Sequence, residues 1–354
     1  MRIRWAAALS FAMGVCCFAQ SAQSQSTSND KNLLSTPLRR AAERDIPSKT
    51  RKLVSCRWFS LACLSCYGSF QSAARLSADP NTRSRTSDGW MDEFTGLLAF
   101  DGSKQPQDFG VNANAGVQAS MNWGLPILRD WGIGAQVGTN VTATQNAVRV
   151  FELLDESRSR TQNFTTVGAF QRLDSGIAWG GVYDFLYEDS YDNFSLGQWR
   201  LRGSYDLSEC NQVGITTQLR SFSDNGNFGN NTPVTLRSIN QGSVYWRRFW
   251  ETGAQTTGWI GIADGHGENN AVTGPSPAKS DSVLFGADIL MPLTSSFAIY
   301  GEANMITPFD TGTVDAFLGL QWYPGRRAFL ARRGKYSPLL STASSTSFST
   351  DLDQ

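Results

Sequence analysis

Polar and apolar residues alternate with a period of two through most of the region from residue 93 to residue 323. Between Phe109 and Trp123 every odd-numbered position is apolar and every even-numbered position is small or polar. Comparable runs begin near residues 133, 177, 199, 213, 283, 297 and 314, and less regular ones cover 93–100, 164–171, 239–249 and 254–263. A period of two indicates strands with one apolar and one polar face. We therefore predict an all-β region of about twelve strands.

The lengths of these strands and of the loops between them favour an antiparallel up-and-down transmembrane β-barrel. Each run has roughly 9 to 13 residues, the length that a tilted strand needs to cross a bilayer. Short connections such as 172–175 and 208–212 alternate with long ones such as 145–160 and 264–281. Transmembrane barrels have short periplasmic turns and long external loops. If twelve strands begin near residue 93, every short turn lies at the same end of the barrel as both chain ends.

The charged residues of the strands lie on the polar face, opposite the apolar positions, except for the pair Arg247 and Arg248, which we place near a rim of the barrel. A charge facing lipid at mid-depth costs about 2–4 kcal/mol for Arg or Lys, so this face is expected to look into an aqueous lumen. All six lysines lie outside the predicted strands. We expect the pore to be lined by Asp184, Glu188, Arg200, Arg202, Asp206, Arg220, Asp288, Glu302 and Asp315. Rows of opposite charge there either filter polar solutes at a constriction or brace the barrel as cross-strand ion pairs.

Aromatic residues gather near the ends of the predicted strands. Those beside short turns are Trp123, Trp131, Trp250, Trp322 and Tyr323, and those beside longer loops are Tyr187, Tyr191, Phe194 and Phe222. Two aromatic girdles at the two membrane interfaces would give this distribution.

The N-terminus has the pattern of an export signal. Arg2 and Arg4 precede an apolar run from Trp5 to Ala19, which small residues follow. This is the layout of a secretory signal peptide, which we place at residues 1–21.

The remaining flanks differ from the barrel in charge and composition. Residues 22–88 form a basic, Ser/Gln-rich arm of net charge +6, and the barrel, assigned to 89–325, has a net charge of −11. Residues 326–354 form a tail that is basic and then Ser/Thr-rich, with net charge +3. Neither flank has a sustained hydrophobic period, so we expect both the arm and the tail to be disordered.

Composition gives little support for catalysis, metal binding or nucleic-acid binding. Lys plus Arg and Asp plus Glu both number 31, which excludes a generically basic nucleic-acid binder. The single histidine, His266, lies in a long loop where nothing orients its imidazole, so we expect no catalytic residue and no enzyme. After the signal peptide the cysteines are Cys56, Cys63, Cys66 and Cys210. A closed zinc site needs two ligands beyond a Cys-x-x-Cys pair, so we predict no metal and no cofactor.

Three stretches carry a resemblance to known proteins, namely residues 180–189 (GGVYDFLYED), 197–203 (GQWRLRG) and 319–325 (GLQWYPG). With them, residues 89–335 resemble outer-membrane β-barrel proteins of the porin type. More closely still, they resemble an uncharacterised family of predicted barrel proteins of unknown function from planctomycete-type bacteria. The resemblance implies a place in the cell outer membrane, with the lipid bilayer and the outer-membrane assembly machinery as partners. Many such barrels end at an aromatic residue of the last strand, whereas about thirty residues follow Tyr323, so assembly would have to read an internal signal.

The function expected from these features is a passive outer-membrane pore for small polar solutes. One alternative is a non-conducting structural or adhesive barrel, plugged by side chains or by its own arm. A barrel hydrolase and a soluble exported β protein are further alternatives.

The net charge of −11 between residues 89 and 325 predicts that the open pore has a mild preference for cations. Reversal potentials of single channels in a salt gradient measure this preference. A reversal potential that reports anion selectivity would contradict the prediction.

Overall fold

The computed structural model describes residues 91–105, 113–146, 159–228, 232–265, 269–270, 274–275, 282–307 and 313–353. The chain divides into two units, Met1–Cys56 and Arg57–Gln354, and every described residue belongs to the second. The predicted signal peptide and arm, with Cys56, Cys63 and Cys66, lie outside the described residues, as does His266. No helix in the described part of the chain is long and apolar enough to cross a membrane.

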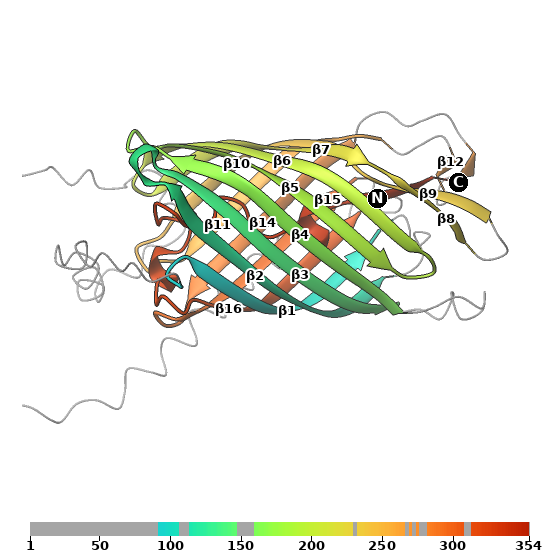
Figure 1. The fold of residues 1–354 in the computed structure, drawn as a ribbon, viewed down its shortest axis with the longest axis horizontal. Coiled ribbons are helices and arrows are strands. Elements are labelled where there is room, and N and C mark those ends of the chain that lie inside the picture. The colour runs from blue at the N-terminus through green and yellow to red at the C-terminus, as the bar shows by residue number, and fades with distance from the viewer. Residues whose placement is uncertain are drawn as a thin grey trace, which may run out of the picture. The chain divides into compact units, whose positions relative to one another are not determined.

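Twelve strands close into an antiparallel barrel in which strands that follow one another along the chain are neighbours in space (Figure 1). The predicted all-β barrel of about twelve strands is therefore confirmed. Its strands are β1 (Phe94–Lys104), β2 (Asn114–Leu128), β3 (Ile133–Asn146), β4 (Ser159–Arg172), β5 (Ile177–Asp189), β6 (Asn193–Ser208), β7 (Asn211–Phe222), β10 (Gln241–Phe249), β11 (Gln255–Ala263), β14 (Ser282–Pro292), β15 (Phe297–Ile306) and β16 (Val314–Trp322). The pairing of β1 with β16 closes the cylinder.

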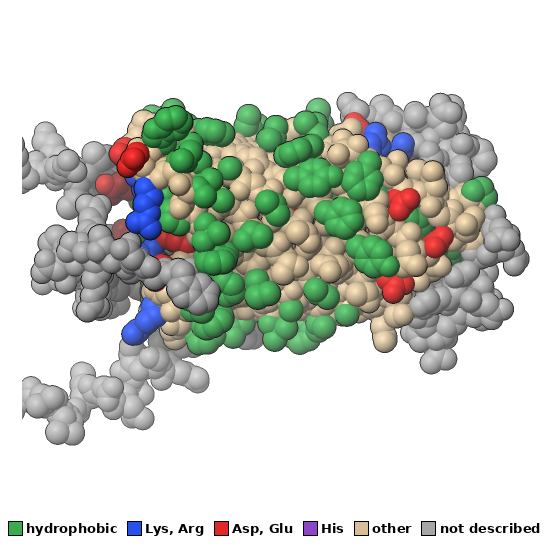
Figure 2. Space-filling view, viewed as in Figure 1, with side chains coloured by type: hydrophobic (Ala, Val, Ile, Leu, Met, Phe, Trp, Pro, Cys, Tyr) green, Lys and Arg blue, Asp and Glu red, His purple; other side chains and the backbone are tan. Residues whose placement is uncertain are grey.

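The wall of the barrel is apolar outside and polar inside. Val117, Val137 and Leu201 are 48%, 40% and 45% exposed on the outer surface. Their sequence neighbours Gln118 and Gln136 are buried inside. In Figure 2 the hydrophobic side chains gather over the middle of the visible face, and the charged side chains lie toward its two ends. The period-two pattern thus predicted correctly which face of each strand is apolar.

Several strands extend further than the alternation predicted, and β1 and β2 are two examples. β1 continues to Lys104, and β2 continues to Leu128, so the predicted turn 124–131 shrinks to a 3-10 turn, η3 (Arg129–Trp131), and Gly132. The reason is that the pairing of β1 with β16 and of β2 with β3 goes on through these residues, which satisfies their backbone groups beyond the alternating stretch.

The predicted aromatic girdles are only partly formed. Trp131 and Trp250 are exposed on the outside near the short turns. Tyr323 and Phe194, however, are buried, because each packs against the residues that follow β16. These two rings belong to the interior and not to a membrane interface.

A second sheet lies at the long-loop end. Its strands are β8 (Asp224–Phe228), β9 (Thr232–Ser238), β12 (Asn269–Asn270), β13 (Gly274–Pro275) and β17 (Thr350–Asp353). The strand order is β13-β12-β17-β9-β8, so the last strand of the chain is the central one. The hairpin β8–β9 follows β7, and β12 and β13 follow β11, which are the positions of the predicted long loops.

The predicted disorder of the tail is wrong. Residues 324–353, here called the C-terminal segment, leave β16 at the short-turn end, pass through the lumen and finish as β17 at the other end (Figure 1). The segment contains two 3-10 turns, η4 (Ala328–Leu330) and η5 (Ser345–Ser347), and most of residues 338–352 are buried. It is ordered because the polar barrel wall binds it, although its own sequence offers little apolar surface.

An arginine placed on the apolar outer surface tests the orientation of the wall. Leu201→Arg, in the middle of β6, is expected to lower the free energy of unfolding from lipid by about 2–4 kcal/mol, because the charge faces hydrocarbon. Leu207→Arg, on the same outer face near the end of β6, should cost about 0–1 kcal/mol, since the membrane interface tolerates charge. Urea titration in lipid vesicles measures both, and equal costs would contradict this orientation.

Candidate functional site

Ion pairs hold the C-terminal segment where it enters the lumen at the short-turn end. Arg327 contacts Glu93, to which it donates a hydrogen bond, and lies 3.8 Å from Asp92. Burial raises the pKa of the Glu93 carboxyl above its usual value, against the opposing effect of the Arg327 charge. Deeper in, Arg332 donates a hydrogen bond of 2.8 Å to Asp288 of β14.

In the middle of the lumen, side chains of the wall hydrogen-bond the backbone of the C-terminal segment. The carbonyl of Leu340 accepts from Asn122 (3.0 Å) and Gln136 (2.6 Å), and the carbonyl of Ala343 accepts from Asn140 (3.1 Å). Further bonds of this kind run from Arg200 to the carbonyl of Ser341 (2.8 Å), from Gln198 to that of Ser347 (2.9 Å) and from the amide of Ala343 to Thr166 (3.0 Å). Hydroxyl groups of the segment also bind wall carboxylates, Ser345 to Asp101 (3.0 Å) and Thr346 to Glu302 (2.8 Å). The polar wall thus replaces the regular hydrogen bonds that this stretch lacks.

Two glycines of the inner wall make room for the segment. A Cβ atom at Gly124 of β2 would overlap the carbonyl oxygen of Tyr336. A Cβ atom at Gly138 of β3 would come within 3.2 Å of the Cβ of Thr342. At Gly124 any larger residue would push the segment away from the wall, because the overlap there is with backbone, whereas at Gly138 the contact is with the Thr342 side chain. Wall and segment are therefore complementary in shape.

At the long-loop end the segment is anchored by an apolar cluster. Phe348 is fully buried among Phe164, Leu186, Leu196 and Leu236, and its ring centroid lies 5.8 Å from that of Phe164. These side chains come from the inner faces of β4, β5 and β6 and from β9. Burial of such a ring stabilises the docked segment by several kcal/mol.

A final contact joins β17 to the second sheet. Arg237 of β9 donates hydrogen bonds of 3.1 and 2.6 Å to the carboxylate of Asp351. β17 pairs with β9 on one side and with β12 on the other. The end of the chain is therefore fixed at the end opposite to the one where the segment enters.

The structure brings several of the charged residues named from the sequence together in pairs. Arg200 donates hydrogen bonds to both carboxylate oxygens of Asp184, one of them 3.0 Å long. Glu188 lies 2.9 Å from Arg160 of the preceding strand. These pairs join neighbouring strands, the arrangement expected of pairs that brace a barrel.

The other named residues are spread along the wall. Asp288 and Asp315 are buried, Arg202 and Glu302 are half-buried, and Asp206 and Arg220 are exposed. Asp315 accepts a hydrogen bond from Gln105 (2.9 Å), and Asp206 accepts one from Gln212 (2.8 Å). Arg220 lies near the end of β7, opposite Gln198 of β6.

Sequence reasoning missed four charged residues that hold the interior together, namely Asp101, Arg160, Arg247 and Arg332. The first two fell in predicted loops, and Arg332 fell in the tail taken as disordered. The expected place of Arg247 near a rim is wrong, because it follows the alternation of β10 and faces inward, buried 3.9 Å from Asp288. More accurate limits for β1 and β4 would have placed Asp101 and Arg160 on the inner face of the barrel. No local signal in the sequence places Arg332 inside the barrel.

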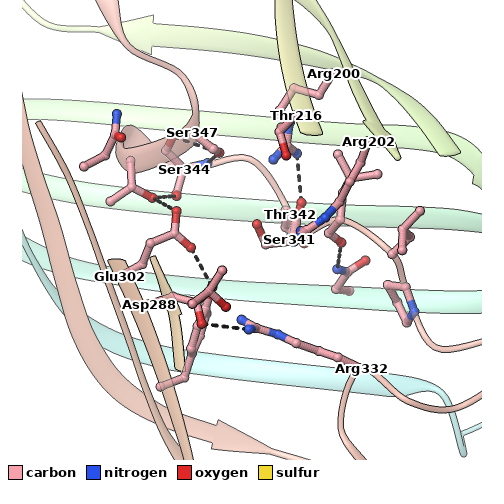
Figure 3. A pocket seen from close by; sticks show the side chains of 18 of the residues that line it. Arg200, Arg202, Thr216, Asp288, Glu302, Arg332, Ser341, Thr342, Ser344 and Ser347 are labelled. Carbon is pink, nitrogen blue, oxygen red and sulfur yellow. Dashed lines mark hydrogen bonds and ion pairs between the residues drawn. The ribbon is translucent and has the colours of Figure 1, made fainter. Parts of the chain in front are cut away.

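A cavity of about 150 Å³ remains between the C-terminal segment and the wall (Figure 3). Arg200, Arg202, Asp288 and Glu302 line it from the wall, and Arg332 lines it from the segment. In Figure 3 Arg332 is directed at Asp288, and Ser341 lies against Arg200. No three His, Cys, Asp or Glu side chains among the described residues converge in a way that could hold a metal ion.

Comparisons with known proteins give a family and a set of distant structural likenesses. A family model described as a family of unknown function (DUF6666) matches residues 92–350. The chain is similar to a structure from a study of the in-meso crystallization of membrane proteins, with 11% identity, a TM-score of 0.44, and 73% of this chain and 100% of that chain covered. It is also similar to an outer membrane channel from Pseudomonas putida, with 10% identity, a TM-score of 0.45, and 65% of this chain and 93% of that chain covered.

An active-site mutant of outer membrane phospholipase A from Escherichia coli is a further structural likeness, with 8% identity, a TM-score of 0.38, and 67% of this chain and 93% of that chain covered. A search of the curated proteins found no match. Likenesses as distant as these do not bear on what this chain does.

Replacement of Phe348 tests how strongly the segment is anchored. Phe348→Ala is expected to weaken docking of the segment by about 3–5 kcal/mol, because it leaves a cavity in the apolar cluster. Phe329→Ala removes the same ring from an exposed position of the segment and should change little. Hydrogen exchange of the amides of residues 338–352 measures docking, and equal protection in both variants would contradict the anchoring role.

Proposed function

The chain belongs to the family of unknown function (DUF6666), and we propose that it is an outer-membrane barrel whose polar lumen is a pathway for small solutes that its own C-terminal segment keeps closed. The observation that carries this proposal is the course of residues 324–353 through the lumen, with hydrogen bonds to both its backbone and its hydroxyl groups. A polar interior of this kind suits passage of polar solutes, and a segment bound across it closes the passage.

The outer surface supports a place in a membrane. Large apolar side chains are exposed on all twelve strands, including Leu98, Met121, Trp179, Ile260 and Leu320. Soluble proteins rarely expose continuous apolar areas larger than a few hundred Å², whereas a membrane barrel needs such a belt. The belt therefore argues against the alternative of a soluble exported β protein. A closed barrel leaves no unpaired strand edge in the hydrocarbon, as spanning a membrane requires.

A second candidate is a permanently closed structural barrel. The anchoring of the segment at both ends, through Arg327 and Arg332 on one side and Phe348 and Asp351 on the other, favours it. The composition of the stretch between these anchors favours release, because residues 341–347 are only Ser, Thr and Ala and have little apolar surface to bury. The two candidates differ in whether the lumen conducts ions once the C-terminal segment has been removed.

Other expectations remain predictions. These are recognition by the assembly machinery through an internal signal, membership of a planctomycete-type group, and the absence of an enzymatic activity. A role for His266 in hydrolysis concerns a residue outside the described part of the chain.

Removal of the segment tests the closure directly. The full chain in a planar bilayer should show a closed baseline, and a chain truncated after Lys335 should show discrete open steps, because the wall stays intact while the lumen empties. Heat-modifiable gel mobility confirms that both forms are folded. A truncated, folded barrel that stays silent would favour the structural candidate, and equal conductance of both forms would overturn closure by the segment.

A point substitution gives the same test without shortening the chain. Gly124→Val should open the pore, since its side chain overlaps the backbone of Tyr336. Gly258→Val makes the same change on the outside of β11, where nothing lies within 4 Å, and should leave the baseline closed. Open steps in both variants would show that barrel distortion, and not displacement of the segment, causes the conductance.

A further inference from the structure

Residues 337–349 of the C-terminal segment lie to one side of the lumen. The hydrogen bonds that residues 337–349 make to barrel strands go to β1, β2, β3, β4, β6 and β15. None of them goes to a residue of β7 or β10 within the described part of the chain. Arg333 stacks on the ring of Phe249 at the end of β10, but the inner faces of β7 and β10 from Thr216 to Gln218 and from Gln241 to Arg247 line the cavity and form its far wall.

This uncovered wall carries polar side chains whose hydrogen-bonding groups have no partner. Gln218 of β7 lies opposite Gln241 of β10, and Thr216 lies opposite Ser243. The side-chain oxygen of Gln218 and both polar atoms of the Gln241 amide are buried without a hydrogen bond, and Gln241 is only 5% exposed. A buried amide in this state is unfavourable, so the wall is suited to a ligand that both donates and accepts hydrogen bonds.

A guanidinium without a carboxylate partner completes the wall. Arg202 of β6 donates through Nε to the phenol oxygen of Tyr245 (3.0 Å) and stacks on its ring, 4.2 Å from the centroid. Its terminal nitrogens make no hydrogen bond to a described residue, and the side chain lines the cavity. Nearby, the single carboxylate of Asp288 faces both Arg247 (3.9 Å) and Arg332 (2.8 Å). Among the described residues that line the cavity there are four arginines, namely Arg200, Arg202, Arg247 and Arg332, against the two carboxylates Asp288 and Glu302, so its charge is in positive excess.

We propose that the cavity binds a small hydroxylated organic anion, with its carboxylate on Arg202 and its hydroxyl groups on Gln218 and Gln241. The planar guanidinium suits a carboxylate, and the two amides supply donors and acceptors for hydroxyl groups. A cavity of about 150 Å³ accommodates about six non-hydrogen atoms, as an engineered cavity of that size holds benzene. This inference rests on the proposed function, because it names the class of solute that the closed lumen holds.

Three matched probes separate charge from hydroxyl groups. Glycerate carries both, glycerol carries only hydroxyl groups, and propionate carries only the carboxylate. Isothermal titration of the full chain in detergent should give the tightest binding for glycerate. Equal binding of glycerol would overturn the role of charge, and equal binding of propionate would overturn the role of the amides. If none of the three binds, the cavity holds water only and the proposal fails.

A pair of arginine variants locates the anion. Arg202→Gln should weaken glycerate binding about tenfold or more and leave glycerol unchanged, because a hydrogen bond to a charged group is lost. Arg220→Gln removes an exposed arginine that does not line the cavity and should bind glycerate as the full chain does. Equal losses in both variants would indicate nonspecific attraction and overturn the site. Because titration uses the closed chain, failure here leaves the conductance of the truncated chain as an independent result.

Discussion

A backbone without helix or sheet hydrogen bonds can lie at membrane depth only where polar groups surround it. In this protein the inner wall of the barrel supplies those groups. Amides of Asn122, Gln136 and Asn140 reach the carbonyls of a stretch that forms no regular structure of its own. The polar lumen and the irregular segment therefore depend on each other, and both the cavity and the proposed closure follow from their fit.

The two ends of the segment have different chemistry because they lie at different ends of the barrel. Arginines hold the segment where it enters, through carboxylates at Glu93 and Asp288. At the other end the apolar ring of Phe348 and the strand β17 hold it. The last barrel strand and the segment are continuous, so the pairing of β16 with β1 and the filling of the lumen are linked along the chain.

The sequence was sufficient to predict the barrel because strand alternation is a local signal. It predicted the number of strands and the inward direction of Arg200 and Asp184. It placed both chain ends on the side of the short turns, which holds for the start of β1 and the end of β16 but not for β17, which lies at the long-loop end. It could not give the course of the tail, since Ser, Thr and Ala show no period and the groups that bind them come from strands far apart in the chain. Inward glycines such as Gly124 and Gly138 were visible, but they mark a close approach only once the segment is in place. Which part of the wall is left uncovered, here at Gln218 and Gln241, likewise depends on the side of the lumen that residues 337–349 occupy.

The central claim is that the C-terminal segment lies inside the barrel against β3, and a disulfide tests it most directly. Gly138→Cys combined with Thr342→Cys, with the native cysteines replaced by serine, places two Cβ atoms 3.2 Å apart, close to the 3.5–4.5 Å of a disulfide. Mild oxidation should join the two positions and change the mobility of the unfolded chain on a gel. Val137→Cys with Thr342→Cys, on the outward face of the same strand, should stay reduced. No cross-link at 138, or equal cross-linking at 137, would contradict a segment inside the lumen.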